Sequence, residues 1–193
     1  MIKIFKMRKL LLTILIVCLC SCEDNSKKIS AAVVSARIEA SSIGVDIMKK
    51  GGNAFDAMVA TDLALSVCYP NAGNIGGGGF LVYRTKTGEV GSLDFREKAP
   101  SKANEKMFIN PEGFVTKKKS TIGGLSVGVP GTVAGLFEVH SKLCSLPFED
   151  LIQPAIDLAR NGFIVTEKQA NSLNKHQEDF ISLNGQETFY GRR

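Results

Sequence analysis

The sequence contains no tryptophan and only two histidines, His140 and His176, among its 193 residues. Neither histidine belongs to an H-E-x-x-H motif or to another metal-binding spacing, and no C-x-x-C motif occurs. The pattern gives no support to metal catalysis, and we expect neither a metal nor a cofactor. His140 stands between Phe137 and Leu143 in an apolar stretch, where a histidine is more often a packed residue than a catalyst.

No apolar run is long enough to cross a bilayer comfortably as a helix, which takes about 20 residues. The chain instead begins with a basic segment, MIKIFKMRK, followed by the short apolar stretch LLTILIVCL. A basic start before a short apolar core is typical of a secretory signal peptide. A zinc cluster of the three cysteines in this region is not favoured, because its context is apolar and no histidine is near.

The apolar stretch ends in L-C-S-C, which resembles the lipobox of bacterial lipoproteins, where a cysteine becomes the lipidated N-terminus of the mature protein. We predict a lipoprotein-type signal peptide over residues 1–21, lipid attachment at Cys22 and a linker over residues 22–30. The mature chain would then be lipid-anchored in the bacterial envelope, in the periplasm or at the outer membrane. A plain N-terminal anchor, or a signal cleaved elsewhere, is the alternative.

Net charge nearly vanishes once the signal peptide is set aside. Residues 1–21 hold four of the 24 basic residues and none of the 19 acidic ones, so the formal charge falls from +5 to +1. We therefore expect no nucleic-acid partner, because such binding depends on a strongly basic surface. The run Lys117–Lys119 is interpreted as a solvated turn.

Hydrophobic periodicity predicts helices that alternate with short strands, without a regular βαβ period. Helices are predicted over residues 37–50 and 54–68, after Pro130 as far as Leu143, over 148–159 with a kink or split at Pro154, and from Thr166, which forms a capping box with Gln169. Strands are predicted over residues 31–35, 80–84, 89–97 and 125–129, and the second and third form a hairpin. This mixture favours an α/β (α+β) fold in which helices cover a sheet.

Two cysteines lie in the body of the chain, Cys68 and Cys144. An oxidising envelope compartment would permit a disulfide between them. Two buried thiols in apolar helices are the alternative, and the residues alone leave both open.

Four consecutive glycines, Gly76–Gly79, have no side chains to pack and lose much chain entropy on folding. They do not form a Walker phosphate loop, since no Lys-Ser/Thr pair follows them, nor a dinucleotide-binding loop, since a strand rather than a helix follows. Two interpretations remain: backbone amides that approach a ligand, or close packing between a helix and a strand.

In the segment LDFRE, Leu93 and Phe95 point to one face of a strand, and Asp94 and Arg96 point to the other. An arginine fixed beside a glycine-lined backbone is suited to hold a carboxylate through two parallel hydrogen bonds. A structural ion pair of Arg96 with Asp94 or Glu97 is the alternative, and the pattern alone favours it.

Residues 124–128, GLSVG, match the G-x-S-x-G motif of serine hydrolases, and Asp157 and His176 follow in the order that an α/β-hydrolase needs. The context does not fit, because the motif lacks a strongly apolar strand before it and an immediate helix after it. A serine hydrolase that uses Ser126 is therefore a minor alternative.

Several longer segments together resemble one family. In chain order, KKGGNAFDAMVATDLALSVCYPNAGNIGGGGF, SLDFREKAP, GVPGTVAG and QPAIDLARNGFIV are similar to the large-subunit half of γ-glutamyltranspeptidases of the bacterial envelope type. The resemblance runs from about Ala31 to Val165. It implies the N-terminal-nucleophile hydrolase fold, an αββα sandwich in which two sheets lie between helix layers.

The resemblance also implies a function. In this family a precursor cleaves itself, and the new N-terminal threonine attacks the γ-glutamyl amide of glutathione, with its own amine as base. The γ-glutamyl group then passes to water or to an amino-acid acceptor. The arginine of the D-F-R-E motif, Arg96 here, is expected to hold the α-carboxylate of the γ-glutamyl group.

The sequence departs from the family because Thr-Thr-His, the usual cleavage site, does not occur in it. We therefore interpret residues 31–193 as a partial large-subunit domain, truncated at its C-terminus, that lacks the catalytic threonine and is inactive without the small subunit. A non-catalytic lipoprotein with an amino-acid-binding cleft is the alternative. A degraded reading frame with an unfolded product, exposing unpaired strand edges, is a further one.

Overall fold

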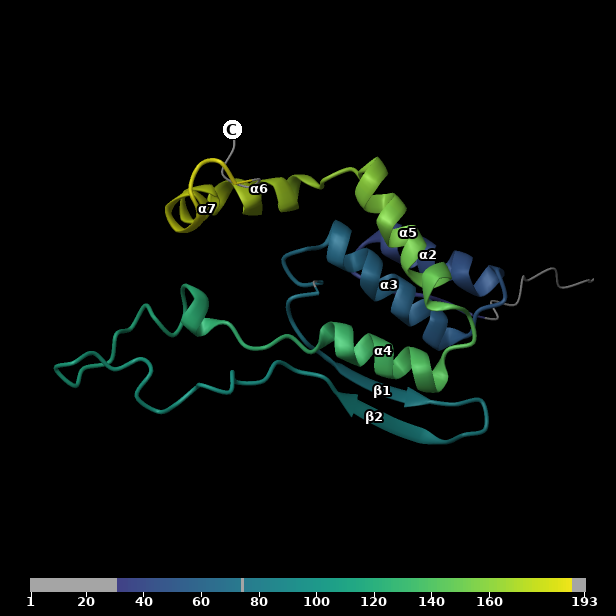
Figure 1. The fold of residues 1–193 in the computed structure, drawn as a ribbon. Helices are drawn as coiled ribbons and strands as arrows, with labels where there is room; N and C mark the ends of the chain where they lie inside the picture. The colour runs from purple at the N-terminus through teal and green to yellow at the C-terminus, as the bar shows by residue number, and fades with distance from the viewer. Residues whose placement is uncertain (1–30, 74, 189–193) are drawn as a thin grey trace, which may run out of the picture. The chain divides into compact units, whose positions relative to one another are not determined.

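The structure is a computed structural model that describes residues 31–73 and 75–188 (Figure 1). The predicted signal peptide (1–21), Cys22 and the predicted linker (22–30) lie outside these described residues. The chain divides into two units, Met1–Ala32 and Val33–Arg193, and every element described below belongs to the second. These elements are α2 (Ile38–Lys49), α3 (Ala54–Cys68), β1 (Phe80–Arg84), β2 (Val90–Asp94), the 3₁₀ turn η1 (Gly124–Ser126), α4 (Thr132–Leu143), α5 (Phe148–Asn161), α6 (Glu167–Lys175) and α7 (Gln177–Asn184).

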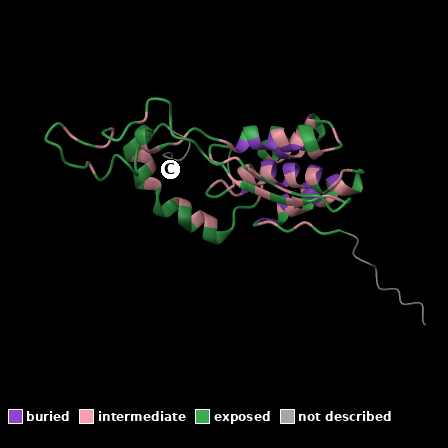
Figure 2. Cartoon of the chain, turned by 90° about the horizontal axis from the view of Figure 1, so that it is seen from below, coloured by how far each residue is buried: buried purple, intermediate pink, exposed green. Residues whose placement is uncertain are grey.

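Helix α3 is the centre of the hydrophobic core. It contacts α2, α4 and α5 (Figure 1), and buried residues gather in these helices (Figure 2). The sequence indicated this position, because apolar residues surround most of α3 and such a helix packs on several sides. The main core consists of aliphatic side chains from four helices: Ile47, Val59, Ala60, Leu63, Leu136, Val139, Leu151 and Ala155.

Two local signals set the boundary between α2 and α3. Gly51 has a φ of +99°, a left-handed conformation that glycine tolerates, so α2 ends beside it. Asn53 then caps α3: its side chain accepts hydrogen bonds from Phe55 N and Asp56 N, and the Asp56 carboxylate accepts one from Asn53 N. Both signals act on backbone groups within a few residues of the helix ends that they set.

The described residues contain a two-stranded antiparallel sheet, in which β1 pairs with β2. Phe80 lies opposite Asp94, and Arg84 lies opposite Val90. The connecting turn contains Gly88, whose φ of +91° requires glycine. The predicted hairpin is therefore confirmed, with its second strand ending at Asp94.

Side chains alternate across the hairpin, so its two faces differ. Leu81 and Leu93 pack against the helical core. On the other face, Phe80, Val82 and Val90 are 66%, 82% and 72% exposed. This second face carries exposed apolar side chains that the helical core does not cover.

Two predicted strands are wrong. Residues 31–35 form no strand, because among the described residues no second strand lies beside them to pair with their backbone. Residues 125–129 are wrong for a different reason: Gly123, with a φ of +93°, turns the chain into η1. Only Val129 of this segment forms a bridge, and its partner is Lys98.

The helices of the second half agree with the sequence except in detail. Helix α4 begins two residues after Pro130, and Pro154 lies inside α5 without splitting it. Thr166 caps α6 by accepting a hydrogen bond from Gln169 N, whereas the Gln169 side chain binds Arg37 instead of completing the predicted box. Across residues 31–73 and 75–188, every helix is too short or too polar to span a membrane.

Candidate functional site

The glycine run packs backbone against backbone. A Cβ atom added to Gly78 would lie 2.7 Å from Arg96 Cα and 2.8 Å from Glu97 N. A Cβ atom added to Gly131, before α4, would overlap the carbonyl oxygen of Phe95. Atoms at such separations repel strongly, so only glycine fits at both positions. The structure thus supports the interpretation of the run as a site of close packing.

Glycines also fix the position of Phe95, the neighbour of Arg96. The Phe95 ring fills space that a Cβ atom on Gly79 or Gly135 would occupy. The Gly77 carbonyl oxygen accepts a hydrogen bond of 2.9 Å from Gly131 N, which joins the run to the start of α4. Because Phe95 is held on both sides, the backbone at Arg96 has little freedom to move.

Arg96 forms an ion pair with Asp94, as the sequence pattern favoured. Its Nη2 donates to Asp94 Oδ2 at 3.0 Å, and its Nε lies 3.2 and 3.3 Å from the two carboxylate oxygens. Its Cζ lies 4.8 Å from the centre of the Phe80 ring, a cation–π distance. The hydrogen bonds raise the pKa of Arg96 and lower the pKa of Asp94, so both remain charged. The Arg96 side chain is 61% exposed.

Arg96 also lines a pocket of about 370 Å³ between the end of β2 and the start of α4. Asp94, Lys98 and Glu138 contribute the other charges of its lining. Asp94 is paired with Arg96, and Glu138 is paired with Lys142. The Arg96 guanidinium and the Lys98 ammonium are therefore the groups of this lining that are suited to a small carboxylate.

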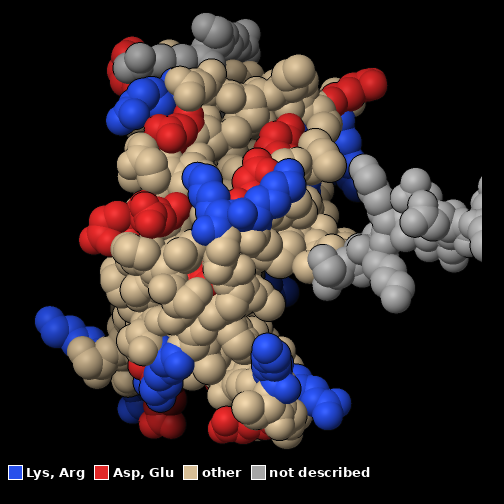
Figure 3. Space-filling model, turned by 90° about the vertical axis from the view of Figure 1, so that its right-hand side faces the viewer, with Lys and Arg blue, Asp and Glu red and all other residues tan. Residues whose placement is uncertain are grey.

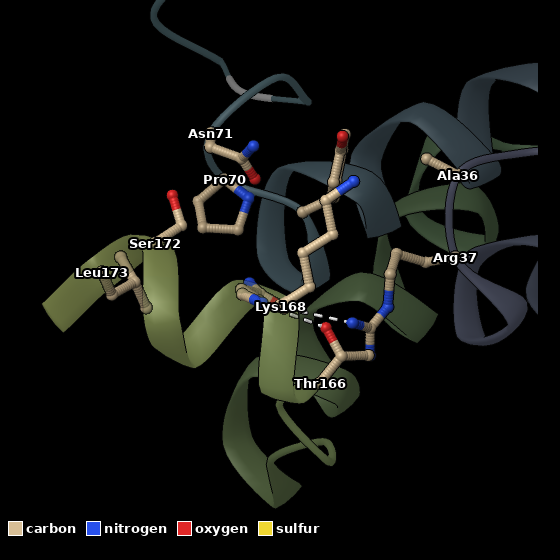
Figure 4. A pocket seen from close by; sticks show the side chains of 10 residues that line it. Ala36, Arg37, Pro70, Asn71, Thr166, Lys168, Ser172 and Leu173 are labelled. Atoms are coloured by element: carbon tan, nitrogen blue, oxygen red, sulfur yellow. Dashed lines mark hydrogen bonds between the residues drawn. The ribbon is translucent and has the colours of Figure 1, made fainter. Parts of the chain in front are cut away.

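A second pocket of about 260 Å³ contains Arg37 and Lys168 in its lining (Figure 4). The Arg37 side chain is only 8% exposed. Its Nε and Nη2 bind the Glu39 carboxylate at 3.0 and 2.8 Å, its Nη1 donates to Gln169 Oε1 at 3.1 Å, and its Nη2 also donates to the Ile164 carbonyl at 2.8 Å. Since the protein itself uses most of the guanidinium donors, Arg37 stabilises the fold rather than awaiting a ligand.

Asp56 does more than cap helix α3. It is fully buried, and its carboxylate accepts hydrogen bonds from Asn53 N, Ser145 N, Ser145 Oγ and Leu146 N at 2.6–3.0 Å. Burial alone would raise the pKa of Asp56, but these hydrogen bonds outweigh it and hold the pKa below its ordinary value. The carboxylate therefore joins the start of α3 to the loop between α4 and α5.

Cys68 and Cys144 are free thiols in the structure, so the disulfide alternative is not realised there. Burial raises the pKa of both thiols, to about 12 for Cys144, which also lies near the negative charge of Asp56. Neither has the low pKa of a reactive cysteine.

The three residues of the serine-hydrolase alternative find partners elsewhere. The exposed Ser126 donates its hydroxyl hydrogen to the Gly123 carbonyl at 2.7 Å. Asp157 forms an ion pair with Arg160, and His176 Nδ1 lies 3.2 Å from Asp179 Oδ2. Within residues 31–73 and 75–188 no hydrogen bond joins these three side chains, so they do not form a catalytic triad there.

His140 is a packed residue, as expected. Its Nε2 lies 2.9 Å from the Leu146 carbonyl oxygen, and its ring meets the Phe148 ring edge-on. Within the described ranges, no group of three or more His, Cys, Asp or Glu side chains could hold a metal ion.

Charges of both signs are interspersed on the face drawn in Figure 3, over a surface that is mostly uncharged. Lys117–Lys119 are exposed and lie in a turn, as predicted. The face in Figure 3 therefore lacks the continuous basic surface that nucleic-acid binding requires.

Sequence reasoning missed two neighbours of Arg96. Phe80 lies opposite Asp94 in the hairpin, which brings it beside Arg96. The sequence alone does not fix the register of the two strands, so it could not place Phe80 there. Lys98 reaches the pocket because it pairs with Val129, a contact across the long loop that no local pattern indicates.

The sequence matches the family model of γ-glutamyltranspeptidase over residues 40–192. The glutathione hydrolase proenzyme of Escherichia coli (strain K12) is 45% identical over 149 residues, which make up 77% of this chain and 26% of that protein. The chain thus spans about a quarter of the length of this curated relative.

Two solved structures are similar in fold as well as in sequence. The γ-glutamyltranspeptidase of Helicobacter pylori has a TM-score of 0.77 and 45% identity, over 80% of this chain and 44% of that chain. The γ-glutamyltranspeptidase of Pseudomonas nitroreducens complexed with L-DON has a TM-score of 0.73 and 41% identity, over 83% of this chain and 47% of that chain.

Proposed function

The chain belongs to the γ-glutamyltranspeptidase family and has part of the N-terminal-nucleophile hydrolase fold, and from this we propose that it holds the γ-glutamyl group of the substrate in a glutathione hydrolase. The observation that carries the proposal is the position of Arg96, which lines a pocket and keeps N–H donors that no described residue uses. These donors would bind the α-carboxylate of glutathione or of another γ-glutamyl compound.

The reaction proposed is transfer of the γ-glutamyl group from an amide to water or to an amino acid. A threonine nucleophile attacks the γ-carbonyl carbon, the amine leaves, and the acyl-enzyme is then cleaved by the acceptor. The residues of this chain would supply orientation: a fixed α-carboxylate places the γ-carbonyl at a set distance from the nucleophile. The 193 residues contain no Thr-Thr-His, so we assign the nucleophile to a small subunit outside them.

The exposed face of the hairpin supports a small-subunit partner. Phe80, Val82 and Val90 form an apolar surface beside the Arg96 pocket, since Phe80 stacks on Arg96. A second layer of the sandwich fold would bury these side chains and part of the Arg96 side chain together. Assembly would therefore complete both the core and the substrate site.

We also propose that residues 1–21 are a lipoprotein signal peptide and that Cys22 anchors the protein to the envelope membrane. The support is the basic start, the short apolar stretch and the cysteine at its end. Metabolic labelling with a fatty acid in a bacterial host should label the full chain and not the Cys22→Ser variant. Equal labelling of both would disprove attachment at Cys22.

Glutamate binding to the full 193-residue chain tests the role of Arg96. In a nuclear magnetic resonance titration, L-glutamate should shift signals around Arg96 and Phe95, and Arg96→Ala should abolish these shifts. Arg84→Ala is the matched control, because it removes the same charge from the far end of the same hairpin. Unchanged binding by Arg96→Ala would refute the assignment.

Turnover separates the enzyme from its rival, a non-catalytic lipoprotein with an amino-acid-binding cleft. The chain alone should release no p-nitroaniline from γ-glutamyl-p-nitroanilide, because it holds no N-terminal threonine nucleophile. Addition of a small subunit should produce turnover that Arg96→Ala impairs through a higher KM. Glutamate binding without any turnover on addition of a small subunit would favour the rival, and turnover by the chain alone would contradict the proposal.

A further inference from the structure

Arg37 and Arg96, each of which lines a pocket, are held in the same way at one edge of the guanidinium and differ at the other. In both, Nε and Nη2 face a carboxylate, that of Glu39 for Arg37 and that of Asp94 for Arg96. The opposite edge of Arg37, formed by Nη1 and Nη2, is taken by Gln169 and the Ile164 carbonyl. The matching edge of Arg96 has no partner among residues 31–73 and 75–188.

A guanidinium can bind two carboxylates at once because it has five N–H donors in a planar fork. In Arg96, Asp94 uses the Nε–H and one hydrogen of Nη2. Both hydrogens of Nη1 and the second hydrogen of Nη2 remain, and a parallel pair of them matches the two oxygens of a carboxylate. Asp94 and a substrate carboxylate can therefore bind Arg96 together without competing for donors.

Two neighbouring side chains, those of Asp94 and Phe80, restrict the rotation of the Arg96 side chain. Asp94 is itself anchored, because one of its carboxylate oxygens accepts a hydrogen bond of 3.0 Å from Arg96 N. Phe80, directly opposite Asp94 in the hairpin, covers one face of the guanidinium. An exposed arginine without such contacts samples many rotamers, and binding would have to order it first.

We propose that Asp94 and Phe80 are positioning residues that hold the Arg96 guanidinium so that its Nη1–Nη2 edge is kept ready for the substrate α-carboxylate. This inference rests on the proposed function of Arg96. Asp94 acts here by orientation although its charge opposes that of the substrate, so its removal should weaken binding. An Asp94 that merely occupied Arg96 in place of the substrate would have the opposite effect.

The test is the affinity of the full 193-residue chain for L-glutamate, measured by nuclear magnetic resonance titration. Asp94→Asn should raise the Kd roughly fivefold to tenfold, and Phe80→Leu about threefold, since the first loses the two-oxygen contact and the second only the ring. Asp46→Asn and Phe114→Leu are the matched controls, because they alter an exposed ion pair and an exposed ring elsewhere. Both controls should bind as the unaltered chain does.

A second readout follows the arginine itself. The Arg96 Nε–H signal should exchange slowly with water in the unaltered chain and should be lost or broadened in Asp94→Asn, whereas Phe80→Leu and the controls should keep it. These substitutions should leave the fold intact, because exposed ion pairs contribute little to stability. Circular dichroism of each variant verifies that it is folded.

Unchanged or tighter glutamate binding by Asp94→Asn overturns the inference, as does an Arg96 Nε–H signal that this substitution leaves unaltered. If the unaltered chain shows the slowly exchanging signal but binds no glutamate, the proposed function of Arg96 fails and the inference falls with it. That outcome differs from failure of the positioning role alone, in which the unaltered chain binds glutamate and Asp94→Asn binds it equally well.

Discussion

The close packing of the glycine run predicts that one added methyl group can displace the run from the backbone of Phe95–Glu97. In Gly78→Ala, the new Cβ atom would lie 2.7 Å from Arg96 Cα and 2.7 Å from the Phe95 carbonyl oxygen. Both atoms belong to backbone, so no side chain can rotate away to make room. Gly124→Ala is the matched control, because a Cβ atom there meets nothing within 4 Å and the residue has no positive φ.

The size of the effect follows from the required displacement. The backbone would have to move by about 0.7 Å to restore ordinary van der Waals contact, and overpacking of this kind costs about 1–3 kcal/mol. The same movement strains the hydrogen bonds between Gly79 and Phe95, each worth about 1 kcal/mol. Gly78→Ala should therefore lower the free energy of unfolding by about 2–4 kcal/mol. Gly124→Ala should change it little or raise it by up to about 1 kcal/mol, because alanine restricts the unfolded chain.

Urea unfolding followed by far-ultraviolet circular dichroism measures both variants, since the sequence has no tryptophan for fluorescence. With a slope near 2 kcal/mol per M, the midpoint of Gly78→Ala should fall by about 1–2 M. The same variant should weaken glutamate binding, because the displaced backbone carries Arg96. If Gly78→Ala and Gly124→Ala unfold at the same urea concentration, the close-packing account of the run is wrong.

Three further predictions concern buried polar groups. Asp56→Ala should lower the free energy of unfolding by about 3–5 kcal/mol, because four hydrogen-bond donors lose their acceptor. The pKa of Asp56 is lower in the folded chain than in the unfolded chain, so its contribution to stability is present above the unfolded pKa and is lost as the pH falls through the folded pKa. Below about pH 4, Asp56→Ala should therefore lose less stability than the unaltered chain does. Cys144 has a pKa of about 12 in the folded chain, so little of it is the reactive thiolate at about pH 8. Alkylation of Cys144, followed by peptide mapping, should be roughly a thousandfold slower in the folded chain than in the urea-unfolded chain. Equal rates would contradict its burial. Arg37→Ala should cost roughly 2–4 kcal/mol because Glu39 loses its partner, whereas Arg96→Ala should leave the urea midpoint unchanged; equal midpoints would contradict the distinction between the two arginines.

Helix boundaries could be predicted from the sequence because their causes are local. Gly51 and Gly162 have positive φ values at helix ends, and Asn53 and Asp56 cap each other within one turn. Each of these residues acts on backbone groups no more than a few positions away. The sequence therefore contains the whole interaction, and no knowledge of the tertiary fold is needed.

Strands were predicted less well because a strand depends on a partner. The hairpin of β1 and β2 supplies its own partner across a short turn, and its prediction is confirmed. Residues 31–35 have a suitable composition, but composition cannot show whether another strand lies beside them. Residues 125–129 likewise read as a strand, although the positive φ of Gly123 turns the backbone before them.

Only part of the candidate site could be predicted from the sequence. Period-two alternation placed Asp94 and Arg96 on one face, and their ion pair confirms this placement. The buried network of Arg37 was not accessible, because its partners Gln169 and Ile164 lie more than 120 positions away in the chain. No local pattern distinguishes an arginine most of whose donors are used within the protein, such as Arg37, from one that keeps an edge free, such as Arg96.

The solvent exposure of the Arg96 side chain should change when the proposed small subunit binds. A carboxylate that binds a guanidinium in water gains little, because the charges are screened and both groups lose their hydration. The 61% exposure of the Arg96 side chain therefore implies that the 193-residue chain binds glutamate weakly, with a Kd on the order of millimolar. A partner that covers Phe80 and Val82 would also exclude water from Arg96, so the same contact would strengthen substrate binding. Glutamate and the small subunit should each raise the affinity for the other, because both depend on the burial of one guanidinium.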